Sequence, residues 1–217
     1  MELAGKKIAF LGDSITEGCG TSDISHVFWN VLGQRTGAKV YGYGIGGTRI
    51  APQQHLQDWE QEGYYESRVD GMIGDADIVV VFGGTNDFGH GDAPFGSLMD
   101  EDKRTFCGAL HSLCRKLIEK YPAAQLVILT PTHRSSEDDG PYNEIGVRLS
   151  CNLQGYVDAI IQIAGFYSIP VLDLYRVSGI QPRVEALKQR YMPDGLHPND
   201  AGNERIAEKL IGFLKTL

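Results

Sequence analysis

Five short runs of apolar, often β-branched residues are spaced along the chain, and each predicts a β-strand. Their apolar positions are mostly continuous instead of alternating, which is typical of strands covered on both faces in a parallel sheet. Glycine or proline follows several of the runs, as expected where a strand ends. The runs cover residues 7–11, 39–43, 77–82, 125–130 and 170–174.

Amphipathic stretches lie between these runs and predict helices. Phe106, Leu110, Leu113 and Leu117, for example, follow one another at three- and four-residue steps, which places them on one face of a helix. Ser25 precedes the first stretch and is expected to be its N-cap. The predicted helices cover residues 26–35, 102–121, 149–167, 183–191 and 201–217.

The alternation of strands and helices predicts an α/β fold, a three-layer α/β/α sandwich with right-handed crossovers. We find no internal repeat and no linker, so residues 1–217 are expected to form one domain. Two longer loops, residues 88–100 and 132–146, follow the third and fourth strands. Ligands bind at the carboxyl ends of parallel strands, so these loops either border a site or are solvated connections.

Composition and charge narrow the classes of function. The 217 residues include 20 basic and 28 acidic ones, for a formal net charge of −8, and basic residues do not cluster. A nucleic-acid partner is therefore not expected. No apolar run approaches the ~20 residues of a membrane span, and the first residues do not resemble a signal peptide, so we expect a cytoplasmic protein. Cys107 and Cys114 are expected to be small buried thiols.

Polar and glycine residues follow the first three predicted strands. Ser14 lies directly after the first strand, in the sequence GDS, and Asn86 follows the third, in GGTND. Gly46 and Gly47 follow the second strand and allow backbone N–H groups to approach a ligand closely. Taken singly, each segment is equally an ordinary turn: a cap serine, a left-handed asparagine or a glycine loop.

A fourth segment precedes the last predicted helix. Asp194 and His197 are three residues apart in DGLHP, a spacing at which a tight turn can place a carboxylate beside an imidazole. The carboxylate would then orient the ring, whose far nitrogen could serve as a general base for a serine. The alternative is a solvated loop histidine and a helix cap.

The order and spacing of these four segments resemble the SGNH (GDSL) hydrolase family, over nearly the whole chain. The resemblance implies a flavodoxin-like fold with five parallel strands in the order 2-1-3-4-5. It also implies that Ser14 is the nucleophile and that Asp194 and His197 complete a catalytic triad. The oxyanion hole would consist of the backbone N–H groups of Ser14 and Gly47 and the side chain of Asn86.

One position departs from the family pattern. Many members have a serine or a similar residue where this chain has Gly46. The backbone donor is therefore Gly47 or its neighbour Gly46.

Other polar residues near these segments are candidates for lesser roles. Asp13 and Asp87 flank the candidate catalytic positions and could order their loops, or could be solvated carboxylates. His90 and His133, with Arg134 beside the latter, could contact substrate or could lie on the surface. The remaining histidines do not have the spacing of metal ligands, so no metal and no cofactor is expected.

These observations predict a serine esterase that cleaves a carboxylic ester through an acyl-serine intermediate. Glycines after the strands indicate a shallow cleft, which favours a short acyl group, such as the acetyl ester of a carbohydrate or another small molecule. Three alternatives stay open: a lysophospholipase- or thioesterase-type acylhydrolase, a non-catalytic carbohydrate-binding module, and a flavin-binding protein of the same architecture. The oligomeric state is not predicted.

Overall fold

Five parallel strands form one sheet at the centre of the computed structural model, which describes residues 1–55 and 63–217. The strands lie in the order β2-β1-β3-β4-β5, and every neighbouring pair is parallel, so the predicted topology is confirmed. The strands are β1 (Lys7–Gly12), β2 (Lys39–Gly44), β3 (Ile78–Phe82), β4 (Gln125–Leu129) and β5 (Val171–Leu172).

The register of the first three strands brings their carboxyl ends together. Gly12, the last residue of β1, pairs with Gly44 of β2 on one side and with Phe82 of β3 on the other. The segments that follow these strands therefore leave the sheet side by side at one edge. This edge is where the sequence predicts the candidate site.

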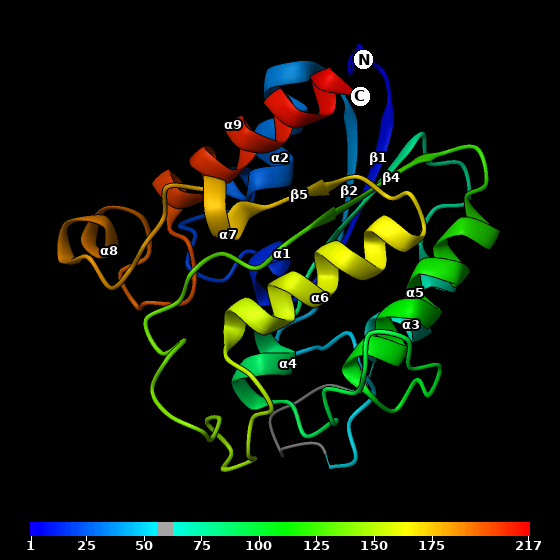
Figure 1. Ribbon diagram of the computed structural model, residues 1–217. Coiled ribbons are helices and arrows are strands. Elements are labelled where there is room, and N and C mark those ends of the chain that lie inside the picture. The colour runs from blue at the N-terminus through cyan, green and yellow to red at the C-terminus, as the bar shows by residue number, and fades with distance from the viewer. Residues whose placement is uncertain (56–62) are drawn as a thin grey trace.

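Helices cover both faces of the sheet (Figure 1). Helices α2 and α9 lie on one face, and α3, α5 and α6 lie on the other. The α-helices are α1 (Ser14–Glu17), α2 (Phe28–Thr36), α3 (Tyr65–Arg68), α4 (Thr85–His90), α5 (Phe106–Lys120), α6 (Leu153–Phe166), α7 (Leu174–Val177), α8 (Glu185–Tyr191) and α9 (Asp200–Thr216). Two 3₁₀-helices, η1 (Ile24–His26) and η2 (Val69–Gly71), complete the described elements.

The central strands β1, β3 and β4 have no polar side chain beyond the first residues of β1 and β4, because each face packs against its own layer of helices. In β1, Ile8 and Phe10 point into the core beneath α2 and α9, and Ala9 and Leu11 point into the core beneath α5 and α6. Successive side chains of a strand alternate between the two faces, so a strand covered on both sides has no polar position. The edge strand β2 is the exception, since its residues are exposed or only partly buried.

Helix α2 begins later than predicted, and Ser25 is not its N-cap. Ser25 instead lies in η1, where its backbone N–H donates to Asp23. Val27 occupies the cap position, and the N–H of Phe28 donates to the side chain of Asn203 in α9 at 3.0 Å. The cap thus comes from a residue 175 positions away, which local sequence cannot indicate.

Other boundaries also differ from the prediction because polar residues cap the elements. Thr105 caps α5 by accepting from the N–H of Gly108, and Asn152 caps α6 in the same way, so both helices begin about one turn later than expected. The fifth strand is shorter than predicted because Asp173 caps α7. The predicted loop 88–100 begins inside helix α4, whose residues are all buried.

The two ends of the chain lie next to each other, as Figure 1 shows. The amino group of Met1 donates to the carbonyl of Lys215 at 2.9 Å. Cys107 and Cys114 of α5 are buried, as predicted. Within the described ranges, every helix is too short or too polar to cross a bilayer.

Candidate active site

Ser14 is the first residue of α1, directly beyond the end of β1. The carboxylate of Asp13 accepts from the N–H of Ile15 at 3.0 Å and so caps this one-turn helix. The backbone N–H of Ser14 has no acceptor among the described residues. Ser14 is only 8% exposed at this edge of the sheet.

The structure brings His197 and Asp194 to this serine. Ser14 Oγ lies 3.0 Å from His197 Nε2, and His197 Nδ1 lies 2.7 Å from a carboxylate oxygen of Asp194. The other oxygen of Asp194 accepts from the N–H groups of Leu196 and His197, at 2.8 and 2.7 Å. A hydroxyl, an imidazole and a carboxylate in this order form the chain through which an imidazole can remove a hydroxyl proton.

The carboxylate of Asp194 is held in its charged form. Partial burial raises its pKa, but the two backbone N–H groups and the imidazole of His197 outweigh that effect and leave the pKa below its ordinary value. A charged carboxylate at Nδ1 fixes the tautomer in which Nε2 is free to accept a proton.

Gly20 allows the loop that carries His197 to approach α1. A side chain at Gly20 would place its Cβ 2.8 Å from the carbonyl oxygen of Pro198 and 2.9 Å from Cβ of His197. Its φ of +92° is also a conformation that other residues rarely adopt. The close approach brings the imidazole within reach of Ser14.

The glycine turn after β2 faces Ser14 from the neighbouring strand. The N–H of Thr48 donates to the carbonyl of Ile45 across Gly46 and Gly47, and the φ of Gly47 is +73°. An ideal Cβ built on Gly46 would lie 3.9 Å from Cβ of Ser14, so the turn is adjacent to the serine. The N–H groups of both glycines lack an acceptor in the part of the chain that the structure describes.

Asn86 lies in the first turn of α4 and is tied to the same turn. Its Nδ2 donates to the carbonyl oxygen of Thr48 at 3.1 Å. A carboxamide nitrogen carries two N–H bonds, so this contact leaves one of them for a ligand. Asn86 is 3% exposed, so packing restricts its side chain as well as the contact with Thr48.

Asp87 joins α4 to the segment that follows the glycine turn. Its two carboxylate oxygens accept from the N–H groups of Ile50 and Ala51, at 3.0 and 2.9 Å. Burial raises the pKa of Asp87 to about 6, although these two N–H groups oppose the shift. Asp13 is equally buried, and burial raises its pKa to about 6 as well. Neither carboxylate is solvated, so that alternative is wrong for both.

His90 and His133 both have protein partners. His90 is buried at the end of α4, not in an open loop, and its ring contacts the guanidinium of Arg49. Nδ1 of His133 lies 2.8 Å from the carboxylate of Glu137, and its ring packs on Tyr175 at 3.8 Å between centroids. Arg134 is buried instead of lying on the surface.

Arg134 holds the loop after β4 against α4. Its guanidinium donates to the carbonyl of Thr85 at 3.1 Å and pairs with Glu144. In the same loop, the N–H of Ser135 donates to the carbonyl of Gly195 at 2.8 Å, next to the residues that carry the candidate triad. The loop therefore lies beside the candidate site, which is one of the two alternatives that the sequence left open.

Two residues that sequence reasoning missed hold the strand ends in place. Tyr65 and Arg68 of α3 donate to backbone carbonyls at the ends of β1, β2 and β3. The sequence offers no motif for them. A short polar segment between two loops carries no periodicity that would mark these residues as buried.

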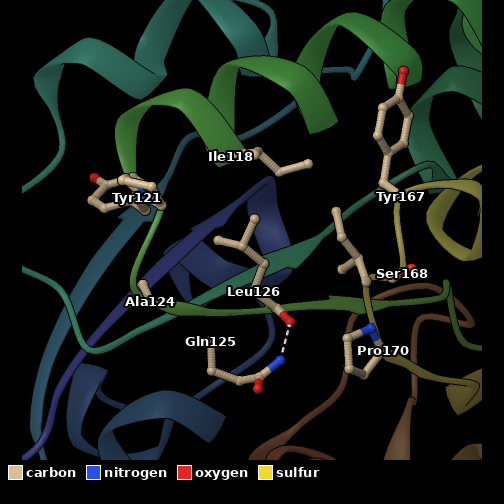
Figure 2. A pocket seen from close by; sticks show the side chains of 10 residues that line it. Ile118, Tyr121, Ala124, Gln125, Leu126, Tyr167, Ser168 and Pro170 are labelled. Atoms are coloured by element: carbon tan, nitrogen blue, oxygen red, sulfur yellow. Dashed lines mark hydrogen bonds between the residues drawn. The ribbon is translucent and has the colours of Figure 1, made fainter.

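A pocket elsewhere in the molecule is not part of this site. It has a volume of about 170 Å³ and lies where α5 and α6 end, beside the first residues of β4. Figure 2 shows its lining, which includes Ile118, Leu126 and Tyr167. Ser14 follows the opposite, carboxyl end of the strands.

A parallel sheet with helices on both faces defines an α/β protein. Its candidate site consists of the polar loops that follow the carboxyl ends of the strands. The sequence model of the GDSL-like lipase/acylhydrolase family matches residues 10–205. The chain belongs to this family, and it is a hydrolase of the esterase and acylhydrolase type.

Relatives support this assignment. A GDSL lipase from Mycobacterium tuberculosis is 27% identical over 212 residues, which are 94% of this chain and 79% of that protein. A solved structure from Lactobacillus plantarum is 32% identical, covers 98% of both chains and superposes with a TM-score of 0.84. A two-domain esterase active on acetylated mannans shares the fold, with 22% identity and a TM-score of 0.64 over 98% of this chain and 49% of its own.

Proposed function

We propose that the protein hydrolyses carboxylic esters through an acyl-serine intermediate on Ser14. The observation that carries the proposal is the continuous chain from Ser14 Oγ to His197 Nε2, 3.0 Å, and from His197 Nδ1 to Asp194, 2.7 Å. In this proposal Ser14 attacks the ester carbonyl and His197 accepts its proton. Asp194 stabilises the resulting imidazolium.

The negative charge that develops on the carbonyl oxygen needs donors that are already in place. We assign this role to the backbone N–H groups of Ser14 and Gly47 and to Nδ2 of Asn86. All three lie at the edge where β1, β2 and β3 end, and the two backbone N–H groups have no acceptor among the described residues. Preorganised donors of this kind lower the barrier because they need no reorientation during the reaction.

The second half of the reaction reuses the same groups. His197 donates its proton to the leaving alcohol oxygen as the bond from that oxygen to the acyl carbon breaks. A water molecule then attacks the acyl carbon while His197 removes its proton. The bond from the acyl carbon to Ser14 Oγ then breaks, His197 returns its proton to Oγ, and the carboxylic acid leaves.

A short acyl group is part of the proposal. The groups that the structure places beside Ser14 are small or polar: the glycine turn, with Glu17 beside Gly46, and the imidazole of His197. Long acyl chains need apolar surface, whereas an acetyl group does not. The fold relationship to an esterase active on acetylated mannans supports an acetyl ester of a carbohydrate or another small molecule as substrate.

The test compares the native protein with Ser14→Ala. We expect the native protein to hydrolyse p-nitrophenyl acetate and to react with a fluorophosphonate probe. We expect the variant to do neither, with its circular dichroism spectrum unchanged. Undiminished turnover by the variant would remove Ser14 as nucleophile. A native protein that neither turns over nor reacts would favour the carbohydrate-binding module.

A series of p-nitrophenyl esters from acetyl to octanoyl tests the acyl group separately. We expect kcat/KM to be highest for acetyl and to fall with chain length. A rate that rises toward octanoyl would favour a lysophospholipase- or thioesterase-type acylhydrolase and would contradict the short-acyl proposal while leaving the serine mechanism intact.

A further inference from the structure

Arg68 lies outside the segments that carry the family resemblance, yet its guanidinium joins two strand ends and the glycine turn. Its Nη1 donates to the carbonyl of Tyr43 at 2.9 Å, near the end of β2. Its Nη2 donates to the carbonyl of Gly12 at 3.0 Å and to Oγ1 of Thr48 at 3.0 Å. Gly12 is two residues before Ser14, and Thr48 directly follows Gly47.

Thr48 connects Arg68 to Asn86, the side-chain donor of the proposed oxyanion hole. Its hydroxyl donates to the carbonyl of Ile45 at 2.7 Å, which closes the glycine turn, and its carbonyl accepts from Nδ2 of Asn86 at 3.1 Å. The N–H of Ile45 in turn donates to the carbonyl of Gly12 at 3.2 Å. Thr48 therefore links Arg68 to Asn86 through hydrogen bonds and to Gly47 through the chain itself. Gly12, two residues before Ser14, links Arg68 to the serine along the chain.

Helix α3 supports the guanidinium and also reaches the third strand. The guanidinium packs over the ring of Tyr65, 4.9 Å from its centroid, and the Tyr65 hydroxyl donates to the carbonyl of Phe82 at 2.8 Å. Phe82 ends β3 and leads into the segment of Asn86. Buried carbonyl groups need donors, and a planar guanidinium offers several at set angles, which an ammonium does not.

We propose that Arg68 is a positioning residue, which sets the geometry of the oxyanion hole by holding the ends of β1 and β2 and the glycine turn in register. The inference rests on the proposed esterase function. Arg68 acts through the backbone of other residues and does not touch the substrate. Its loss should therefore lower kcat far more than it changes KM, because the misplaced donors contribute mainly in the transition state.

The experiment measures kcat and KM for p-nitrophenyl acetate in Arg68→Ala and Arg68→Lys. We expect kcat to fall about 100-fold in Arg68→Ala, since displacements of about 1 Å in a catalytic site have effects of that size. Arg68→Lys should recover little of this loss, because its ammonium cannot span the three acceptors. Sub-denaturing guanidinium ion should raise kcat of Arg68→Ala and leave that of the native protein unchanged.

Arg205→Ala is the matched control. Arg205 in α9 is also partly buried, donates to a backbone carbonyl, that of Ser178 at 2.7 Å, and packs over a tyrosine ring, that of Tyr191 at 5.5 Å. Its removal should cost stability without lowering kcat and without a response to guanidinium. Equal losses of kcat in the two alanine variants would overturn the proposal.

A nearly isosteric substitution, Thr48→Val, provides a second test of the proposal. It removes the hydroxyl that accepts from Arg68 and donates to Ile45. The contact with Ile45 is lost in both backgrounds, so we expect Thr48→Val to lower kcat by a larger factor in the native background than in Arg68→Lys. Additive losses, or an unchanged kcat in Arg68→Lys, would overturn the proposal even if Arg68→Ala does not fold. Ser14→Ala separates the two hypotheses: if it stays active the esterase mechanism fails, and if it is inactive the Arg68 results stand on their own.

Discussion

The hydroxyl of Ser14 and Nε2 of His197 lie 3.0 Å apart although 183 positions separate the two residues in the sequence. Ser14 follows β1 near the start of the chain, and His197 precedes α9 near its end. The pairing depends on the packing of α9 beside α2 and on the close approach of Gly20 to the loop of His197. The geometry of this pair leads to predictions about the residues around it.

Replacement of Asp194 should lower kcat without weakening substrate binding, because Asp194 orients the imidazole and does not contact the substrate. In Asp194→Asn, the amide still accepts from the backbone but no longer stabilises the imidazolium. We expect kcat to fall on the order of 10³- to 10⁴-fold, with KM little changed, in steady-state assays with p-nitrophenyl acetate. Asp158→Asn, which breaks the ion pair with Arg176, is the control and should keep full activity. A loss of less than tenfold in Asp194→Asn would contradict the assigned role.

Removal of the Asn86 side chain should expose the contribution of one oxyanion donor. We expect Asn86→Ala to lower kcat by about 10²- to 10³-fold, as in other sites that lose a single side-chain donor. The carbonyl of Thr48 also loses its partner, so thermal unfolding should show a moderate loss of stability. An unchanged kcat in a folded variant would exclude Asn86 from the oxyanion hole.

The two glycines after β2 should respond differently to alanine. Gly47 has a φ of +73°, so Gly47→Ala should lose about 1–2 kcal/mol of folding stability and much of its activity. At Gly46 the added Cβ meets the carboxylate of Glu17 at 2.8 Å, the end of a flexible side chain that can move. We therefore expect Gly46→Ala to be the milder change, and measurements of urea unfolding and of kcat check both variants. Greater damage from Gly46→Ala would favour Gly46 as the donor.

Asp87 should make stability depend on pH in a specific window. Its pKa is about 6 in the folded protein against an ordinary value of 3.8. Between these values the unfolded chain releases the proton first, so the free energy of unfolding falls as pH rises, and above pH 6 the loss is complete. A shift of about 2 pH units corresponds to about 3 kcal/mol.

Asp87→Asn removes this contribution. Urea unfolding at several pH values should show that the variant gains stability relative to the native protein between about pH 4 and pH 6, on top of a constant cost for the altered hydrogen bonds. Asp138→Asn, which removes a surface carboxylate paired with Arg183, provides the control. A stability difference that does not vary with pH would show that Asp87 is not buried in its charged form at neutral pH.

The sequence by itself determined the fold class and indicated which segments lie together at the candidate site. Continuous apolar runs predict strands buried on both faces because alternate side chains must enter two cores, and amphipathic stretches predict the helices that cover them. Parallel strands end at one edge, so Ser14, Gly47 and Asn86 could be placed together from their positions after three strands. Placing these segments together needs only local periodicity and the rule that parallel strands share a direction, whereas the catalytic roles expected of these residues came from the resemblance to the SGNH (GDSL) family.

Only the tertiary structure decided which distant groups complete these local elements. Asn203 of α9 caps α2 in place of Ser25, and Arg68 joins the ends of β1 and β2 although no motif marks it. The raised pKa values of Asp13 and Asp87 likewise follow from burial that no neighbouring residue in the sequence reveals. Hydrogen bonds and desolvation depend on which groups meet in space, and for Ser14 and His197 that meeting exists only once the sheet and both helical layers have assembled.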